Sequence, residues 1–156
     1  MEAWKTALQR GLVGGATSSL LSTAALAALG QREAGSAYAP TNAVSHWIWG
    51  DRATRHRGPS ARYTLPGYLI HHGSAMFWSV LVERLCGGLL DRRNPALTLG
   101  VGTAASAVAC FVDYQLTPDR LKPGYERHLS RSSLGVVYGA FGLGLALGAM
   151  LSRRTG

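Results

Sequence analysis

Histidine and carboxylate side chains that border apolar segments are the residues of this chain best suited to chemistry. His71 and His72 stand near the start of one such segment, and Asp113 stands near the end of the next. Glu126 and His128 follow in a polar loop. Imidazole titrates near neutral pH, and acids within membranes often mark proton pathways. The five residues are therefore candidates for a proton relay or for a set of ligands.

Three more residues are secondary candidates for the same chemistry. His46 and Tyr125 lie in polar loops, where they can approach the first set. Glu83 lies within an apolar segment, and an ionised carboxylate at the bilayer centre costs on the order of 2.5–3.5 kcal/mol. The neighbouring Arg84 offers a partner, and a position near the segment end lets both side chains reach the interface. We interpret Glu83 foremost as half of an interfacial ion pair.

The spacing of the candidates is not typical of a metal centre. Helical bundles ligate metals through Glu-x-x-His or His-x-x-x-His patterns, whereas this chain offers adjacent His71 and His72 and the pair Glu126-x-His128. Neighbouring helical residues point about 100° apart, so only one of two adjacent histidines readily enters a shared site. If the protein binds a transition metal or haem, the candidate ligands are His72, Asp113 and His128. No cofactor is predicted from the pattern itself.

Four apolar stretches position these candidates, and each is close to the ~20 residues that a helix needs to cross a bilayer. They cover residues 11–30, 67–90, 96–116 and 133–151. The sequence therefore predicts an all-α fold, a polytopic membrane protein in which a four-transmembrane-helix bundle forms a single domain over residues 1–156. In an up-and-down bundle, the start of the second span and the end of the third lie at one membrane face, which would gather the histidines and carboxylates there.

The first stretch has an alternative interpretation as a cleaved signal peptide, because the small residues near Ala37 and Ala39 resemble a cleavage site. The apolar run is longer than the usual signal core of ~7–15 residues, and Pro40 would follow the cleaved bond. These two features favour a span that is retained.

Two polar loops connect the spans. The long loop over residues 31–66 contains a helix-start pattern at Pro40, followed by apolar residues spaced for a short amphipathic helix that lies in the interface. Trp47 and Trp49 suit the depth of the headgroups and are the predicted interfacial anchors. The second loop, residues 117–132, contains two closely spaced turns, which are typical of a packed loop.

The charge pattern indicates which partner the chain meets. The 16 Lys and Arg residues outnumber the 8 acids, and most of them flank the spans. This arrangement favours a lipid bilayer with anionic headgroups over nucleic acid, which would require a basic soluble face with stacking aromatics. The compact Arg92-Arg93 turn, on the side of both termini, favours termini in the cytoplasm.

Small residues recur every fourth position in the first and last spans. In the last span the pairs Gly135/Gly139 and Gly144/Gly148 would let another helix approach closely. Such surfaces suit packing within the bundle, and they also suit a homo-oligomer or a larger membrane complex.

The chain resembles the YagU-type family of small bacterial inner-membrane proteins. The resemblance rests on a first span, a long polar loop, and a second span with an early His72 followed by Phe77 and Glu83. Thr117-Pro118 after the third span and Tyr125-Glu126 before the fourth complete it. The resemblance implies a multi-pass protein of the bacterial inner membrane with a part in acid tolerance.

We therefore expect a small integral membrane protein that contributes to proton or acid-stress homeostasis through His72, Asp113, Glu126 and His128. No nucleophile elbow, Walker loop or dinucleotide fingerprint occurs, so a non-enzymatic role is favoured. Two alternatives stay open. One is an accessory or structural subunit of a larger membrane complex, and the other is a metal- or haem-binding membrane enzyme that uses the same histidines.

Overall fold

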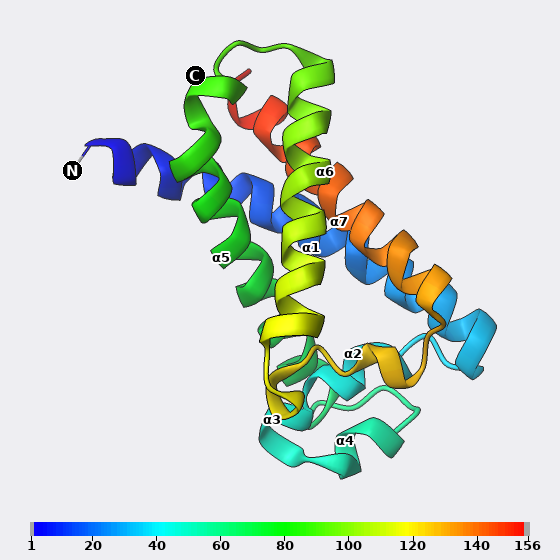
Figure 1. The fold of residues 1–156 in the computed structure, drawn as a ribbon. Coiled ribbons are helices and arrows are strands. Elements are labelled where there is room, and N and C mark those ends of the chain that lie inside the picture. The colour runs from blue at the N-terminus through cyan, green and yellow to red at the C-terminus, as the bar shows by residue number, and fades with distance from the viewer. Residues whose placement is uncertain (1, 155–156) are drawn as a thin grey trace. The chain divides into compact units, whose positions relative to one another are not determined.

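The computed structural model of the protein describes residues 2–154 and the side chains of residues 3–154. This part of the chain is helical and contains no strand, in agreement with the predicted all-α fold. The long helices are α1 (Glu2–Ala34), α5 (Thr64–Leu90), α6 (Pro95–Phe111) and α7 (Arg131–Ser152) (Figure 1). The short elements are α2 (Ala39–Val44), α3 (His46–Trp49), α4 (Asp51–Arg55), η1 (Val112–Leu116), η2 (Asp119–Leu121) and η3 (Tyr125–Arg127).

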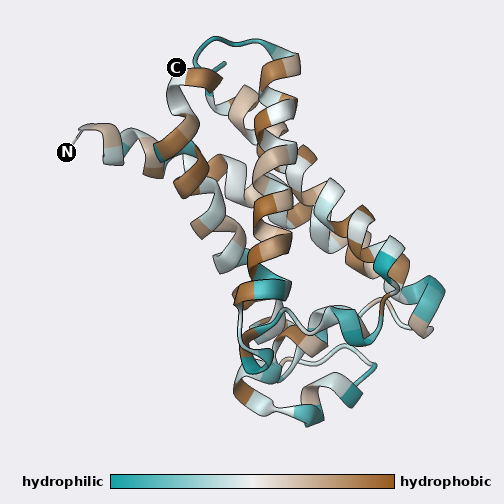
Figure 2. Ribbon diagram, in the orientation of Figure 1, coloured by the Kyte–Doolittle hydropathy of each residue, from teal (hydrophilic) through white to brown (hydrophobic). Residues whose placement is uncertain are grey.

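Within the described residues, three helical segments are long and apolar enough to cross a membrane, namely Ala3–Ala34, Pro95–Leu116 and Arg131–Ser152. They contain the predicted first, third and fourth spans. Figure 2 shows how their apolar residues contrast with the hydrophilic turn between α5 and α6. Helix α5 has 27 residues but is not among the three segments, because its two histidines and its Glu83-Arg84 pair lower its hydropathy. The predicted count of four spans is therefore not confirmed.

The first loop differs from the single amphipathic helix that the sequence predicts. Its helical part is divided into α2, α3 and α4, with breaks at Ser45 and Gly50. Gly50 has φ 60° and ψ −150°, a backbone region that is essentially restricted to glycine. A continuous helix cannot pass through this conformation, and an interfacial helix is accordingly not confirmed.

The chain folds as two compact units, which we describe separately. The first unit contains the described residues up to Ser22, His72–Ala109 and the residues from Tyr138 onward. The second contains Thr23–His71 and Cys110–Val137. Each long helix contributes to both units, so the two are continuous along the chain.

Small residues bring the helices of the first unit into backbone contact. A Cβ built on Gly144 of α7 would collide with the Cα of Ser18 in α1, and one built on Gly148 would collide with the Cα of Gly14. The hydroxyl of Thr17 donates a hydrogen bond of 2.7 Å across this contact to the carbonyl of Gly144. The Gly144/Gly148 pair thus makes the close packing that the sequence predicts.

The other glycine pair of α7 has no such neighbour. A Cβ built on Gly135 or on Gly139 would meet no atom of the described chain within 4 Å. Two pairs with the same spacing therefore have different surroundings, one closed by α1 and one open.

Asn42 is the hydrogen-bonding centre of the second unit and is fully buried. Its side-chain amide donates to the carbonyls of His56 and Gly58 at 3.0 and 2.9 Å. Its side-chain oxygen accepts a hydrogen bond of 2.5 Å from the hydroxyl of Thr64, at the start of α5. One side chain therefore ties α2 both to the segment after α4 and to α5.

The carboxylate of Glu33, near the end of α1, makes a second connection in this unit. It accepts hydrogen bonds from the backbone N–H of Ser130 at 2.7 Å and from the hydroxyl of Ser133 at 2.5 Å. Both donors belong to the first turn of α7 or to the residue before it. The carboxylate therefore accepts hydrogen bonds at a helix start, where backbone N–H groups lack partners within the helix.

The two predicted interfacial tryptophans occupy different surroundings in the second unit. The indole N–H of Trp47 donates a hydrogen bond of 3.0 Å to the carbonyl of Lys122. The ring of Trp49 lies 4.5 Å from the guanidinium carbon of Arg62, in a cation–π contact. Trp47 thus fastens α3 to the second loop, whereas Trp49 is partly exposed.

Candidate functional site

The predicted site residues are divided between the two units. His72 and Glu83 belong to the first unit, and the remaining candidates belong to the second. Nδ1 of His72 lies 3.0 Å from the hydroxyl oxygen of Ser19 in α1, so the imidazole is placed by a helix contact inside its own unit.

The loop around η3 brings several of the predicted residues of the second unit together. The imidazole of His71 meets the ring of Tyr125 edge-on, with 6.3 Å between the ring centroids. The hydroxyl of Tyr114 donates to Glu126 at 3.4 Å, and the same carboxylate oxygen accepts a hydrogen bond of 2.7 Å from the N–H of Gly124. Asp113 precedes Tyr114 in the π-helical turn η1 and is half-buried. Glu126 therefore stabilises its own turn.

His46 presents an unpaired nitrogen inside the second unit. The residue is 5% exposed, and its Nδ1 lies 2.8 Å from the carbonyl oxygen of Ala43. A carbonyl can only accept, so Nδ1 carries the proton and Nε2 carries the lone pair. Nε2 is buried and has no hydrogen-bond partner among the described residues. The imidazole therefore offers one buried acceptor that nothing in the unit uses.

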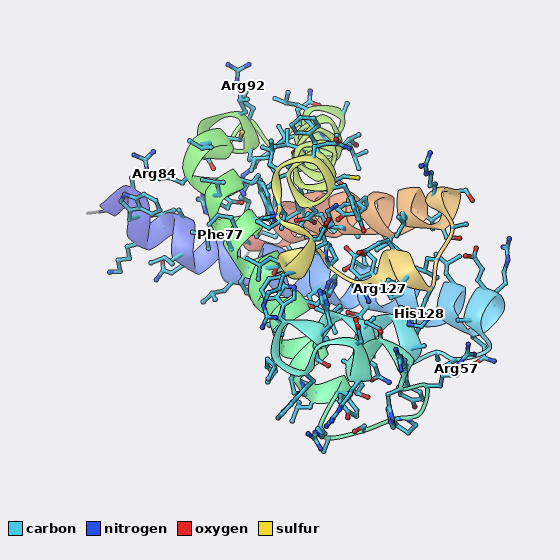
Figure 3. All side chains as sticks on the ribbon, turned by 60° about the horizontal axis from the view of Figure 1, so that its bottom comes forward. Arg57, Phe77, Arg84, Arg92, Arg127 and His128 are labelled. Carbon is cyan, nitrogen blue, oxygen red and sulfur yellow. The ribbon has the colours of Figure 1, made fainter. Side chains whose placement is uncertain are left out.

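His128 also has a buried nitrogen without a hydrogen-bond partner among the described residues, and two arginines lie near this imidazole. Its Nε2 is buried and lacks a hydrogen-bond partner within residues 3–154. Burial lowers the pKa of His128, and the positive charges of Arg57 and Arg127 lower it further against the opposing effect of a backbone hydrogen bond with Thr54. Figure 3 shows Arg57, Arg127 and His128 in the same part of the molecule. Arg127 is itself paired with Asp51 at 2.9 Å.

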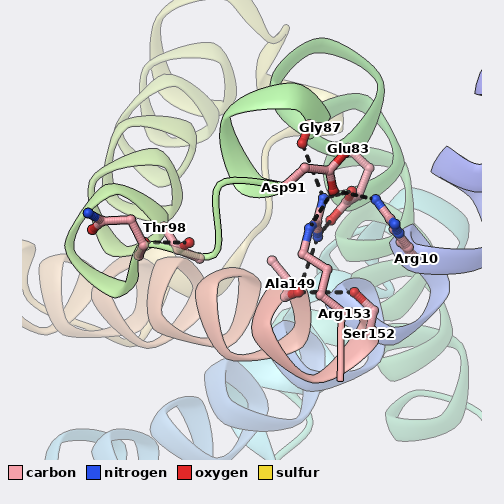
Figure 4. A network of polar contacts seen from close by, with 9 residues as sticks. Arg10, Glu83, Gly87, Asp91, Thr98, Ala149, Ser152 and Arg153 are labelled. Carbon is pink, nitrogen blue, oxygen red and sulfur yellow. Dashed lines mark hydrogen bonds and ion pairs between the residues drawn. The ribbon is translucent and has the colours of Figure 1, made fainter. Parts of the chain in front are cut away.

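A partly buried ionic cluster, consisting of Arg10, Glu83, Asp91 and Arg153, lies in the first unit (Figure 4). Arg153 donates two hydrogen bonds of 2.8 Å to Glu83, one to each carboxylate oxygen, and both side chains are 4% exposed. Nε of Arg153 also donates to Asp91 at 3.0 Å, and Arg10 donates to the same oxygen at 2.7 Å. Such bidentate, charge-assisted pairs are among the strongest hydrogen-bonded contacts in proteins.

This cluster corrects the interpretation of Glu83 as a partner of Arg84. Adjacent helical residues point about 100° apart, so Glu83 faces the interior of the unit while Arg84 is exposed. The guanidinium carbon of Arg84 instead lies 5.2 Å from the centre of the Trp4 ring. Sequence reasoning missed Arg153, which appears as one of several basic residues flanking the last apolar stretch. The one feature of the sequence that points to Arg153 is its position immediately after α7, a helix that could pack against the helix carrying Glu83.

Asp91 connects two arginines at the surface of the cluster. Its partial burial tends to raise its pKa, but Arg10 and Arg153 outweigh this effect and hold the pKa below the usual range for an aspartate. A small recess beside the cluster is lined by Ser79, Glu83 and Thr98, and it has room for about one water molecule.

The described residues contain no group of three or more His, Cys, Asp or Glu side chains placed to hold a metal ion. The proposed ligand set of His72, Asp113 and His128 therefore finds no support in the geometry.

Over residues 2–154, the fold is all-helical, with three helical segments long and apolar enough to span a membrane. In comparisons with known proteins, no family model matches the chain, and neither a curated protein nor a solved structure resembles it at a significant level. The resemblance to the YagU-type family stays a prediction.

Proposed function

We propose that this protein is a small multi-pass protein of the bacterial inner membrane that contributes to proton or acid-stress homeostasis, with its second unit as the part that responds to protons. The three potential spans support residence in a membrane. The bacterial inner membrane, with both termini in the cytoplasm, rests on the sequence alone.

The observation that carries the proposal is the pair of buried imidazole nitrogens in the second unit. Nε2 of His46 and Nε2 of His128 both lack a partner among the described residues. A proton added at Nε2 of His128 creates an N–H without an acceptor among the described residues, which is costly inside a protein. At His128 the new charge also meets Arg57 and Arg127, with Asp51 as the counter-charge that pairs with Arg127. Acidification therefore favours forms of the unit in which the imidazole of His128 reaches water.

Helix α5 is proposed as the fourth span. Its exposed positions are largely apolar, as Phe77 at 63% and Leu85 at 72% exposure illustrate, while its polar Ser79 and Glu83 are buried. Glu83 is also neutralised by Arg153. The low hydropathy of α5 thus comes in part from groups that do not face the surroundings, and its outer surface suits lipid.

A second candidate function, an accessory subunit of a larger membrane complex, is favoured by one specific observation. Gly135 and Gly139 form a small-residue pair on α7, and a Cβ built on either would meet no atom of the described residues within 4 Å. In membranes such pairs let another helix approach closely. A co-purifying partner that is lost in Gly139→Leu would support this role.

Hydrogen exchange of the full chain in lipid nanodiscs, compared at pH 7.5 and pH 5.0, tests the proton-response proposal. After correction for the intrinsic exchange rate, we expect faster exchange over 39–58 and 119–130 at pH 5.0. The double variant His46→Gln/His128→Gln should lose this acceleration, and His56→Gln is the matched control in the same unit. Equal corrected exchange at both pH values, or an unchanged acceleration in the double variant, would contradict the proposal.

A cell-based measurement connects this response to physiology. Survival after acid challenge should fall in cells that lack the protein and should be restored by the wild type but not by His46→Gln/His128→Gln. If the double variant, expressed at the wild-type level, restored survival fully, the two histidines would not be needed for the protein's role in acid survival.

A further inference from the structure

Basic side chains in the first unit outnumber the carboxylates available to pair with them. The seven are Lys5, Arg10, Arg84, Arg92, Arg93, Arg153 and Arg154. The carboxylates described in this unit are Glu83 and Asp91, and Arg10 and Arg153 pair with them. None of the other five cations forms an ion pair with a carboxylate of the described residues. Their charge is therefore available to an external anion.

Arg84 is the best positioned of these five cations. It lies over the ring of Trp4, which is 52% exposed, at 5.2 Å from the ring centre. Figure 3 shows the side chains of Arg84 and Arg92 extending away from the ribbon. A tryptophan beside an arginine is typical of the headgroup level of a membrane, since both side chains combine an apolar body with a polar end.

An apolar surface adjoins Arg84 on the same helix. Phe77 and Leu85 of α5 are among the most exposed large apolar residues of the chain. Gly73 and Gly88 lie along the same helix, and a Cβ built on either would meet no atom within 4 Å. This face of α5 therefore combines apolar side chains with open positions, and it leads directly to a cation.

We propose that an anionic phospholipid binds at this surface, with its headgroup phosphate against Arg84 and an acyl chain along Phe77 and Leu85. Arg92 and Arg93, in the turn after α5, supply the surrounding positive charge. Charge complementarity identifies the occupant, because the five cations without a carboxylate partner among the described residues suit an anionic headgroup and the apolar face suits its chain. The site depends on α5 as a membrane-facing helix, as proposed above, but not on any response to pH.

A lipid titration of the full chain in an uncharged detergent at constant pH 7.5 tests the site. Phosphatidylglycerol should raise the melting temperature in a saturable manner, whereas phosphatidylcholine and inorganic phosphate should not. Arg84→Gln and Arg92→Gln should each weaken binding and so raise the half-saturating concentration of phosphatidylglycerol by roughly fivefold. Arg55→Gln, an exposed arginine of the second unit, is the matched control and should leave it unchanged.

Several results would overturn the site. An equal response to phosphatidylcholine would leave only non-specific lipid binding, and an equal response to inorganic phosphate would leave a free anion as the ligand. Unchanged affinity in both arginine variants would place the lipid elsewhere. Arg84 and Arg92 are exposed, so the melting temperature without lipid should match the wild type and report intact folding. Because pH is held constant, failure of the acid response leaves this result unaffected.

Discussion

Removal of Arg153 should destabilise the first unit more than removal of its partner Glu83. In Arg153→Met the carboxylate of Glu83 stays buried and loses both of its 2.8 Å hydrogen bonds. Breaking a buried ion pair in this way typically costs 3–5 kcal/mol, so we expect a loss of about 4 kcal/mol in the free energy of unfolding.

The reverse change leaves a smaller defect because Arg153 has a second acid. In Glu83→Gln the guanidinium keeps its 3.0 Å bond to Asp91, and the amide oxygen of glutamine can still accept one hydrogen bond. The expected loss is about 1.5–3 kcal/mol, the range for hydrogen bonds to charged groups. The double variant Glu83→Gln/Arg153→Met removes both buried charges, and its stability should recover to within about 2 kcal/mol of the wild type.

Equilibrium unfolding in mixed micelles, followed by circular dichroism of the full chain, measures these differences. Asp51→Asn serves as the control, because it breaks the exposed pair with Arg127, which should be worth at most about 1 kcal/mol. The reasoning is refuted if Arg153→Met costs no more than this control. It is also refuted if the losses of the two single variants simply add in the double variant, since coupling between the buried charges is what the geometry predicts.

Three further predictions concern packing, pH and the polar centre of the second unit. Gly148→Ala should lower the melting temperature clearly, because its Cβ collides with the backbone of Gly14. Gly139→Ala meets no described atom and should leave the melting temperature unchanged or slightly raised. Equal melting temperatures of the two variants would contradict the close packing of α7 against α1. Burial holds the pKa of His128 below its ordinary value. As the pH drops below about 6.5, the unfolded chain therefore protonates His128 before the folded chain does, and the free energy of unfolding should fall. The melting temperature should depend less on pH in His128→Gln than in the wild type. Asn42→Ala removes three hydrogen bonds from a buried site and should cost about 2–4 kcal/mol in unfolding free energy. Gln31→Ala, at an exposed position of the same unit, is the control. A loss below about 1 kcal/mol in Asn42→Ala would contradict the central role of Asn42.

Composition and periodicity predict the long helices well, because the length and apolarity of a segment are local properties. The predicted stretches at 11–30, 96–116 and 133–151 all lie within helical segments able to span a membrane. The stretch at 67–90 lies within α5, whose span assignment depends on where its polar side chains point. That orientation is set by neighbouring helices, so the sequence of α5 alone does not contain it.

The candidate site illustrates the same limit. Local spacing suggested Arg84 as the partner of Glu83, yet the partner is Arg153, 70 residues further along the chain. The glycine pairs of α7 are alike in spacing, but only Gly144 and Gly148 pack against α1. The unpaired nitrogen of His128 likewise reflects burial by distant segments, which no pattern within the loop encodes.

The pairing of Glu83 with Arg153 also has a consequence for the order of synthesis. Arg153 follows Glu83 by 70 residues, which at roughly 5–20 residues per second corresponds to about 4–14 seconds of translation. During this interval α5 carries an acid whose final counter-charge does not yet exist. Glu83 must therefore stay hydrated, take up a proton or find a temporary partner until α7 is complete. The pair between Glu83 and Arg153 can form only after Arg153 has been synthesised. The first unit is therefore completed after the synthesis of every helix that it contains.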